Sequence, residues 1–210
     1  MKFRIAMSCG ILFTVLLGAC SSMSPEECNA TDWAAVGFED GSRGMTSDYF
    51  ANHREACAKH GITADFRAYQ AGRDEGLVQY CQPGRGYELG TRGVRYLGVC
   101  DVALEEEFLD AYRVGHELYE LRSNVNNANS RIAAKEHELE RIRVLIRDKE
   151  ALLIAAETTT AERVLLLADI RDLSVRAGSI QTDIEALIAE RARHERELEN
   201  YQNTVVAYGS

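Results

Sequence analysis

Apolar residues recur at alternating steps of three and four in two long stretches of the chain, residues 118–153 and 166–201. This is the spacing of the a and d positions of a heptad repeat, by which one α-helix supercoils on another. Each stretch is therefore predicted to be a long helix with an apolar stripe. Polar residues that fall on the stripes are expected to extend their stems outward or to set the register: Lys135, Lys149, Arg191 and His194.

The two stripes match each other when the chain is folded back at Thr159-Thr160, because Leu153 then faces Leu166 and the remaining rungs follow in step. The pattern predicts an antiparallel coiled-coil hairpin over residues 116–205, with its turn near 157–161. No Gly or Pro forces that turn. One long helix that pairs between two chains is therefore the alternative, and a homo-oligomer formed through the coiled coil stays open.

Caps and breakers divide the middle part, residues 31–115, into shorter helices. Thr31 or Asp32 is placed to cap one helix, Asp65 another, and Asp101 the long helix that follows. With only two prolines in the chain, and with no alternating apolar and polar run bounded by turn residues, a sheet is not indicated.

Glycines follow aromatic residues at helical spacing in this middle part. Glycine inside a helix costs about 1 kcal/mol relative to alanine, so its repeated use suggests a compensating gain. We expect neighbouring helices to pack closely over these glycines; approach of a ligand to the bare backbone is the alternative. The aromatic residues and their glycines are Trp33 with Gly37, Gly41 and Gly44, Tyr69 with Gly72 and Gly76, Tyr87 with Gly90 and Gly93, and Tyr112 with Gly115.

The N-terminus has the features of an export signal: Lys2 and Arg4, an apolar stretch over residues 5–17, and then Gly18-Ala19-Cys20. This resembles the bacterial lipoprotein signal, in which cleavage precedes a cysteine that is then acylated. Residues 1–19 would be the signal peptide and residues 20–30 the lipidated Cys20 and its tether. Because serine, and not aspartate, follows Cys20, the resemblance implies an outer-membrane lipoprotein facing the periplasm.

Four further cysteines remain in the exported chain, Cys28, Cys57, Cys81 and Cys100, and in an oxidising compartment we expect two disulfides. Three pairings are possible. Short loops favour Cys28 with Cys57 and Cys81 with Cys100, whereas a strict up-down helix order would bring Cys57 near Cys100. A zinc site that includes Cys57 and its neighbouring histidines His53 and His60 is disfavoured, because no Cys-x-x-Cys pair accompanies them. The predicted fold is all-α: a small disulfide-tied helical domain followed by a long antiparallel coiled-coil helical hairpin.

Several motifs of the middle part occur together: Asp32-Trp33, Gly37-Phe38-Glu39-Asp40-Gly41, Cys57-Ala58-Lys59-His60-Gly61, Tyr69-Gln70-Ala71-Gly72-Arg73, Tyr80-Cys81, and Phe108 to Tyr112 with Gly115. In combination they resemble the bacterial lipoprotein family known as domain of unknown function 2799, over residues of about 28–119. The resemblance implies an envelope location and a helical domain that carries cysteines. It implies no activity and no catalytic residue.

The charge and the remaining side chains indicate little chemistry. A formal net charge of -9 argues against nucleic-acid binding. The pairs Glu39-Asp40 and Asp74-Glu75 are expected on solvated helix faces. We predict no catalytic residue, no enzyme activity, no metal and no cofactor, and we identify Trp33, Tyr69, Arg73 and Tyr87 as a possible ligand or interaction surface.

The function expected from these features is a lipid-anchored cell-envelope protein, bound to the membrane by its N-terminal lipid. Its hairpin would be a structural or interaction module that projects into the periplasm and meets a protein partner. Binding of a small ligand or an envelope glycan by the middle domain is the alternative, and an envelope hydrolase is less favoured.

Overall fold

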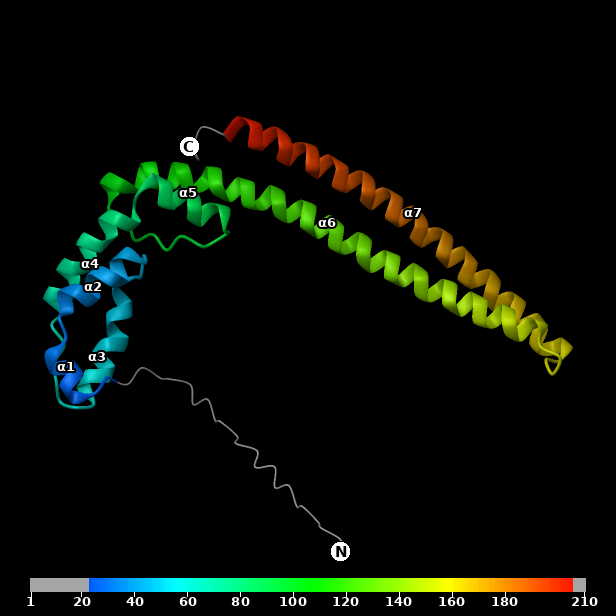
Figure 1. The fold of residues 1–210 in the computed structure, drawn as a ribbon, viewed down its shortest axis with the longest axis horizontal. Helices are drawn as coiled ribbons and strands as arrows, with labels where there is room; N and C mark the ends of the chain where they lie inside the picture. The colour runs from blue at the N-terminus through cyan, green and yellow to red at the C-terminus, as the bar shows by residue number, and fades with distance from the viewer. Residues whose placement is uncertain (1–22, 206–210) are drawn as a thin grey trace, which may run out of the picture. The chain divides into compact units, whose positions relative to one another are not determined.

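The structure is a computed structural model that describes residues 23–205 (Figure 1). The signal peptide and Cys20 lie outside the described residues. The chain divides into two compact units, Met1–Gly76 and Leu77–Ser210, and the division falls within helix α4, Phe66–Tyr80. In the described part every regular element is a helix, which confirms the all-α prediction.

Unit 1 consists of short helices, each begun by the local sequence. The Ser24 hydroxyl and the Glu27 carboxyl form a reciprocal capping box at the start of α1. Asp32 accepts hydrogen bonds from the first turn of α2, and Asp65 does the same for α4. The elements are α1 (Pro25–Ala30), α2 (Trp33–Ser42), the 3₁₀ helix η1 (Ser47–Tyr49), α3 (Phe50–Ala58) and the part of α4 up to Gly76.

Helices α2 and α4 cross with their backbones in direct contact. A Cβ added at Gly37 would lie 1.9 Å from the Tyr69 carbonyl oxygen, and one added at Gly72 would lie 1.9 Å from the Ala34 carbonyl oxygen. Only glycine permits this approach, so the prediction of close packing over the glycines is confirmed.

The core of unit 1 lies between these helices and α3. Phe50 packs between the rings of Trp33 and Tyr69, with centroid separations of 6.0 and 4.8 Å. The Cys28–Cys57 disulfide belongs to the same buried cluster and ties α1 to the end of α3. The short-loop pairing is therefore the one that the structure contains.

Unit 2 contains the end of α4, the short helix α5 (Pro83–Thr91), the long helix α6 (Val102–Ile154) and α7 (Thr160–Val205). Asp101 caps α6, as predicted, by accepting from the Ala103 N–H at 3.0 Å. Helix α5 packs on α6 by the same device as in unit 1, since a Cβ at Gly90 would lie 2.3 Å from the Tyr112 carbonyl oxygen. Phe108, with no exposed surface, and the Cys81–Cys100 disulfide complete this core.

Each unit contains one copy of a related eight-residue segment. Residues 37–44 and 86–93 share the pattern Gly-(Phe/Tyr)-Glu-x-Gly-(Ser/Thr)-Arg-Gly. Both segments end a helix at a glycine with positive φ, 76° at Gly44 and 66° at Gly93. In each segment, the backbone N–H of the residue after that glycine donates to the carbonyl oxygen five residues earlier. The donor and acceptor are Met45 and Asp40 in unit 1, and Val94 and Leu89 in unit 2.

Helices α6 and α7 form an antiparallel hairpin (Figure 1). The predicted stripes meet in one apolar cluster: Ile132, Leu139, Ile142, Ile180, Ile184 and Leu187, with Ile146 and Leu173 packed against it. The contacts Lys149–Asp169 and Lys135–Asp183 between the arms have the predicted register. The stems of these lysines extend away from the seam, and their ammonium groups reach carboxylates on the facing arm. The turn occupies residues 155–159, close to the predicted position.

Candidate functional site

The polar centre of unit 1 is Asp40, of which 4% is exposed. Its Oδ2 accepts a hydrogen bond from the Tyr69 hydroxyl at 2.9 Å and lies 3.1 Å from His53 Nε2. The three side chains come from α2, α3 and α4, respectively. Close contact of α2 with α4 brings Tyr69 to Asp40, and α3 closes the group with His53.

The electrostatics keep Tyr69 a hydrogen-bond donor. Its ring has no exposed surface. Burial, followed by the hydrogen bond to Asp40, raises the pKa of Tyr69 far above its usual value, because the ionised form would be desolvated beside a carboxyl group. The phenol therefore remains protonated and can donate to Asp40 throughout the ordinary pH range.

His53 is the only member of this group with substantial access to solvent, with 24% of its side chain exposed. Its ring lies edge-on to the rings of Tyr49 and Trp33, at centroid distances of 5.6 and 6.2 Å. A histidine held by a buried carboxyl group is the arrangement that orients a general base. The groove of unit 1 described below, however, is lined by neither Asp40 nor His53.

Arg73 has a structural role in the same unit. It is 9% exposed, and its Nε donates to the Met45 carbonyl oxygen at 2.9 Å. That carbonyl follows Gly44, at the point where α2 has ended. Arg73 therefore joins α4 to the chain just beyond α2.

The four residues proposed from the sequence as a ligand or interaction surface fall in different places. Trp33, Tyr69 and Arg73 lie together in unit 1 but are all buried, at 8%, 0% and 9% exposure. Tyr87 lies in unit 2, on α5, where its carbonyl oxygen faces Gly115 of α6. The structure thus brings three of the four together as packing residues.

Part of the chain matches a known protein family. Residues 32–117 match the family described as a protein of unknown function, DUF2799. This match confirms the resemblance inferred from the motifs. It covers less than half of the chain, and the hairpin beyond residue 117 lies outside it. No curated protein and no solved structure matches the chain.

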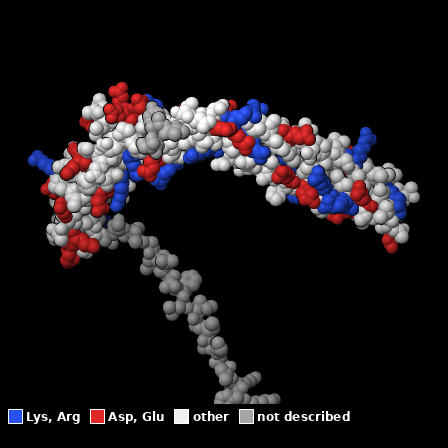
Figure 2. Space-filling model, turned by 45° about the horizontal axis from the view of Figure 1, so that its top comes forward, with Lys and Arg blue, Asp and Glu red and all other residues white. Residues whose placement is uncertain are grey.

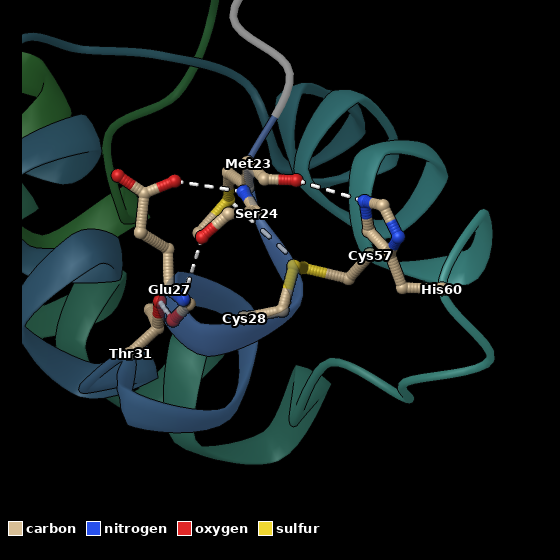
Figure 3. The surroundings of a disulfide bond; sticks show 7 residues. All are labelled: Met23, Ser24, Glu27, Cys28, Thr31, Cys57 and His60. Carbon is tan, nitrogen blue, oxygen red and sulfur yellow. Dashed lines mark hydrogen bonds between the residues drawn. A yellow bond between two sulfur atoms is a disulfide. The ribbon is translucent and has the colours of Figure 1, made fainter.

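The matched segment begins just after the first disulfide cysteine, whose surroundings Figure 3 shows. His60 Nε2 lies 3.1 Å from the Met23 carbonyl oxygen, and the Cys57 sulfur lies 4.0 Å from the Met23 sulfur. These contacts hold the start of the described chain against the end of α3. His53 faces Asp40 instead, so the alternative zinc set of His53, Cys57 and His60 does not assemble.

Among residues 23–205, no group of three or more His, Cys, Asp or Glu side chains is placed to hold a metal ion. In the same residues, no helix combines the length and the apolar character needed to cross a bilayer.

Sequence reasoning missed the burial of Asp40. The expectation of a solvated face holds for Asp74-Glu75, which is exposed, but is wrong for Asp40. A signal was present, since Asp40 follows Gly37 by three residues, which puts it on the same face of α2 as that glycine. The second related segment has Leu89 at the corresponding position, 5% exposed, so the helix-ending motif itself does not require a carboxyl group.

Proposed function

We propose that this protein is a lipid-anchored component of the bacterial cell envelope, and that its α6–α7 hairpin is a structural or protein-interaction module in the periplasm. The proposed anchor is Cys20, at the end of a lipoprotein-type signal. An N-terminal diacyl or triacyl group would hold the chain durably, because each buried CH₂ contributes about 0.8 kcal/mol. Ser21 after the acylated cysteine favours the outer membrane.

The observation that carries the proposal is that the hairpin closes its own apolar seam. The buried rungs of α6 and α7 satisfy each other, so the outer faces of both helices are available to a partner. Ion pairs between the arms accord with the register that the seam sets, including Arg131–Glu190 and Lys135–Asp183, both at 2.8 Å. Figure 2 shows acidic and basic side chains interspersed along the hairpin, as is typical of solvent-exposed helices.

An interaction role accords better with unit 1 than catalysis does. Tyr69 and Asp40 direct their polar atoms at each other within the core, and His53 joins them from the edge. Such a satisfied buried group specifies one packing of three helices. We therefore propose that the protein is not an enzyme.

A second candidate function, binding of a small ligand or an envelope glycan, has one observation in its favour. Unit 1 has a groove of about 490 Å³ whose lining includes Phe50, Phe66, Arg54 and Asp48. Phe66 is 46% exposed, and its ring offers a face on which a sugar ring could stack. Ligand-induced thermal shifts that survive Phe66→Ala would count against this candidate.

The anchor and the interaction role are tested separately. Metabolic labelling with palmitate should mark the wild-type chain but not the Cys20→Ala variant. Equal labelling of both chains would contradict the proposed lipid anchor at Cys20. For the hairpin, a photo-crosslinking residue in place of exposed Arg143 should give a defined protein adduct in intact cells. The matched control replaces exposed Arg67 of unit 1. Adducts from position 67 alone would contradict the role of the hairpin.

A further inference from the structure

The turn between α6 and α7 is an ordered structure. The guanidinium of Arg163 donates to the carbonyl oxygen of Leu153, in the last turn of α6, and to those of Ala155 and Thr158 in the turn that follows. The Thr158 hydroxyl donates to the Leu152 carbonyl oxygen at 2.7 Å. The end of α6 is therefore closed by side chains.

The start of α7 is also capped by side chains. The Thr159 hydroxyl and backbone N–H both donate to the Glu162 carboxyl group, at 2.7 and 2.8 Å, and the Glu162 N–H returns to the Thr159 hydroxyl at 3.3 Å. This reciprocal box lowers the pKa of Glu162, because both donors favour its ionised form. Side chains near the turn are consequently held on defined helix ends.

Five large apolar side chains near this ordered turn are exposed to solvent. The exposed fractions are 55% for Leu152, 81% for Ile154, 62% for Val164, 67% for Leu165 and 54% for Leu167. Seam residues of the same helices, such as Ile142 and Ile184, are 4% and 5% exposed. Where exposed apolar side chains adjoin one another, they are characteristic of a binding surface.

Two of these side chains, Leu152 from α6 and Leu165 from α7, line a groove of about 430 Å³. Its charged lining residues are all acidic: Glu157, Glu162 and Asp169. Lys149 pairs with Asp169 at 2.5 Å, so the negative charge of the rim comes from Glu157 and Glu162, while Arg163 closes the end of α6. The groove therefore combines an apolar floor with a negative rim.

We propose that this tip groove binds an amphipathic helix of a partner protein, with an apolar stripe that seats on Leu152 and Leu165 and with Lys or Arg along its flanks. An apolar groove is the usual receptor for such a helix, and a negative rim complements basic flanks. The inference rests on the proposed role of the hairpin and adds to it the place and the chemistry of contact.

The rim decides between this occupant and two others. In a two-fold contact between two copies, each tip would present the same acidic residues to the other, and like charges would meet. On a membrane surface, the same carboxylates would lie against anionic headgroups, which repel them. A partner helix with basic flanks would instead be attracted by the carboxylates of the rim.

The probes for the test are three synthetic amphipathic peptides with a fluorophore: leucines on one face and lysines beside them, the same with glutamates, and the lysine peptide scrambled. Fluorescence anisotropy with the purified full chain should show binding of the lysine peptide, and at least tenfold weaker binding of the other two. Leu152→Gln and Leu165→Gln should each weaken binding of the lysine peptide at least fivefold, and Glu157→Lys should weaken it as well.

The matched control is Val175→Gln on α7, because Val175 is also an exposed apolar side chain, at 69%, but does not line the groove. Circular dichroism confirms that each variant keeps its helices. Equal binding of the scrambled peptide, equal loss in Val175→Gln, or no binding of the lysine peptide would overturn the proposal.

Two further arms identify the rival occupants. Sedimentation with phosphatidylglycerol–phosphatidylethanolamine vesicles that depends on Leu165, with no peptide binding, would assign the groove to lipid. Self-association in light scattering that is lost in Leu165→Gln would assign it to a second copy. Either result overturns the proposal. If the tip variants have no effect while crosslinks from position 143 persist, the tip inference fails and the proposed function of the hairpin stands.

Discussion

The crossing of α2 and α4 gives the most decisive test of how unit 1 is built. In Gly37→Ala the new Cβ would lie 1.9 Å from the Tyr69 carbonyl oxygen and 2.9 Å from the Arg73 nitrogen, whereas real Cβ atoms essentially never approach within 3.0 Å. The helices must therefore separate by about 1 Å. Backbone atoms cannot rotate away as a side chain does, so the shift is imposed on the whole contact.

The energy follows from that shift. A gap of about 0.5–1 Å forfeits roughly a quarter to a half of each dispersion contact, and overpacking of a core typically costs about 1–3 kcal/mol, occasionally more. Alanine returns about 1 kcal/mol of helix propensity. Because the clash is with backbone, we expect the upper part of the range and a net loss of about 2 kcal/mol or more in the free energy of unfolding of unit 1.

Trp33 makes the assay specific. It is the only tryptophan of the chain and is 8% exposed in the core of unit 1, so its fluorescence follows this unit during urea unfolding. The control is Gly178→Ala on α7, where an added Cβ meets nothing within 4 Å; it should stabilise the hairpin by about 0.5–1 kcal/mol. An unchanged Trp33 transition in Gly37→Ala would refute the reasoning.

Three further predictions concern the first disulfide, the seam of the hairpin and Tyr96. Replacing Cys28 and Cys57 by serine opens a loop with a sequence separation of 29 and should cost unit 1 about 3–4 kcal/mol, seen as an earlier Trp33 transition. Ile142→Ala, at a site 4% exposed, should cost the hairpin about 2–4 kcal/mol in far-ultraviolet circular dichroism and leave the Trp33 signal unchanged. Burial raises the pKa of Tyr96 to about 12, above the value of about 10 in an unfolded chain. The stabilising contribution of Tyr96 should therefore be complete below pH about 10 and fade as the pH rises toward 12. Tyr96→Phe should remove one late step from an absorbance titration of the tyrosines.

The hairpin could be predicted from the sequence because its determinants are local and periodic. A heptad stripe specifies which side of a helix is buried, and two stripes of equal spacing specify their partner. The predicted rung of Ile146 with Leu173 lies in the observed cluster. The starts of helices were accessible for a similar reason, since a cap such as Asp101 acts within one turn.

The polar centre of unit 1 could not be read in the same way. Its contacts join Asp40 to His53 and Tyr69, which are 13 and 29 residues away, and no periodic pattern encodes that convergence. Burial of Trp33 and Tyr69 followed from the same crossing, so aromatic side chains that suggested a surface proved to be core. The three-carbonyl contact of Arg163 at the hairpin turn was hidden for the same reason.

The two disulfides join cysteines that are neighbours in chain order, Cys28 with Cys57 and Cys81 with Cys100. A polypeptide that is exported with its N-terminus first presents these four thiols in that same order. An oxidant that couples each new thiol to the one waiting before it would then produce the native bonds directly. Maturation of this protein should accordingly have little need of an isomerase that reshuffles wrong pairs.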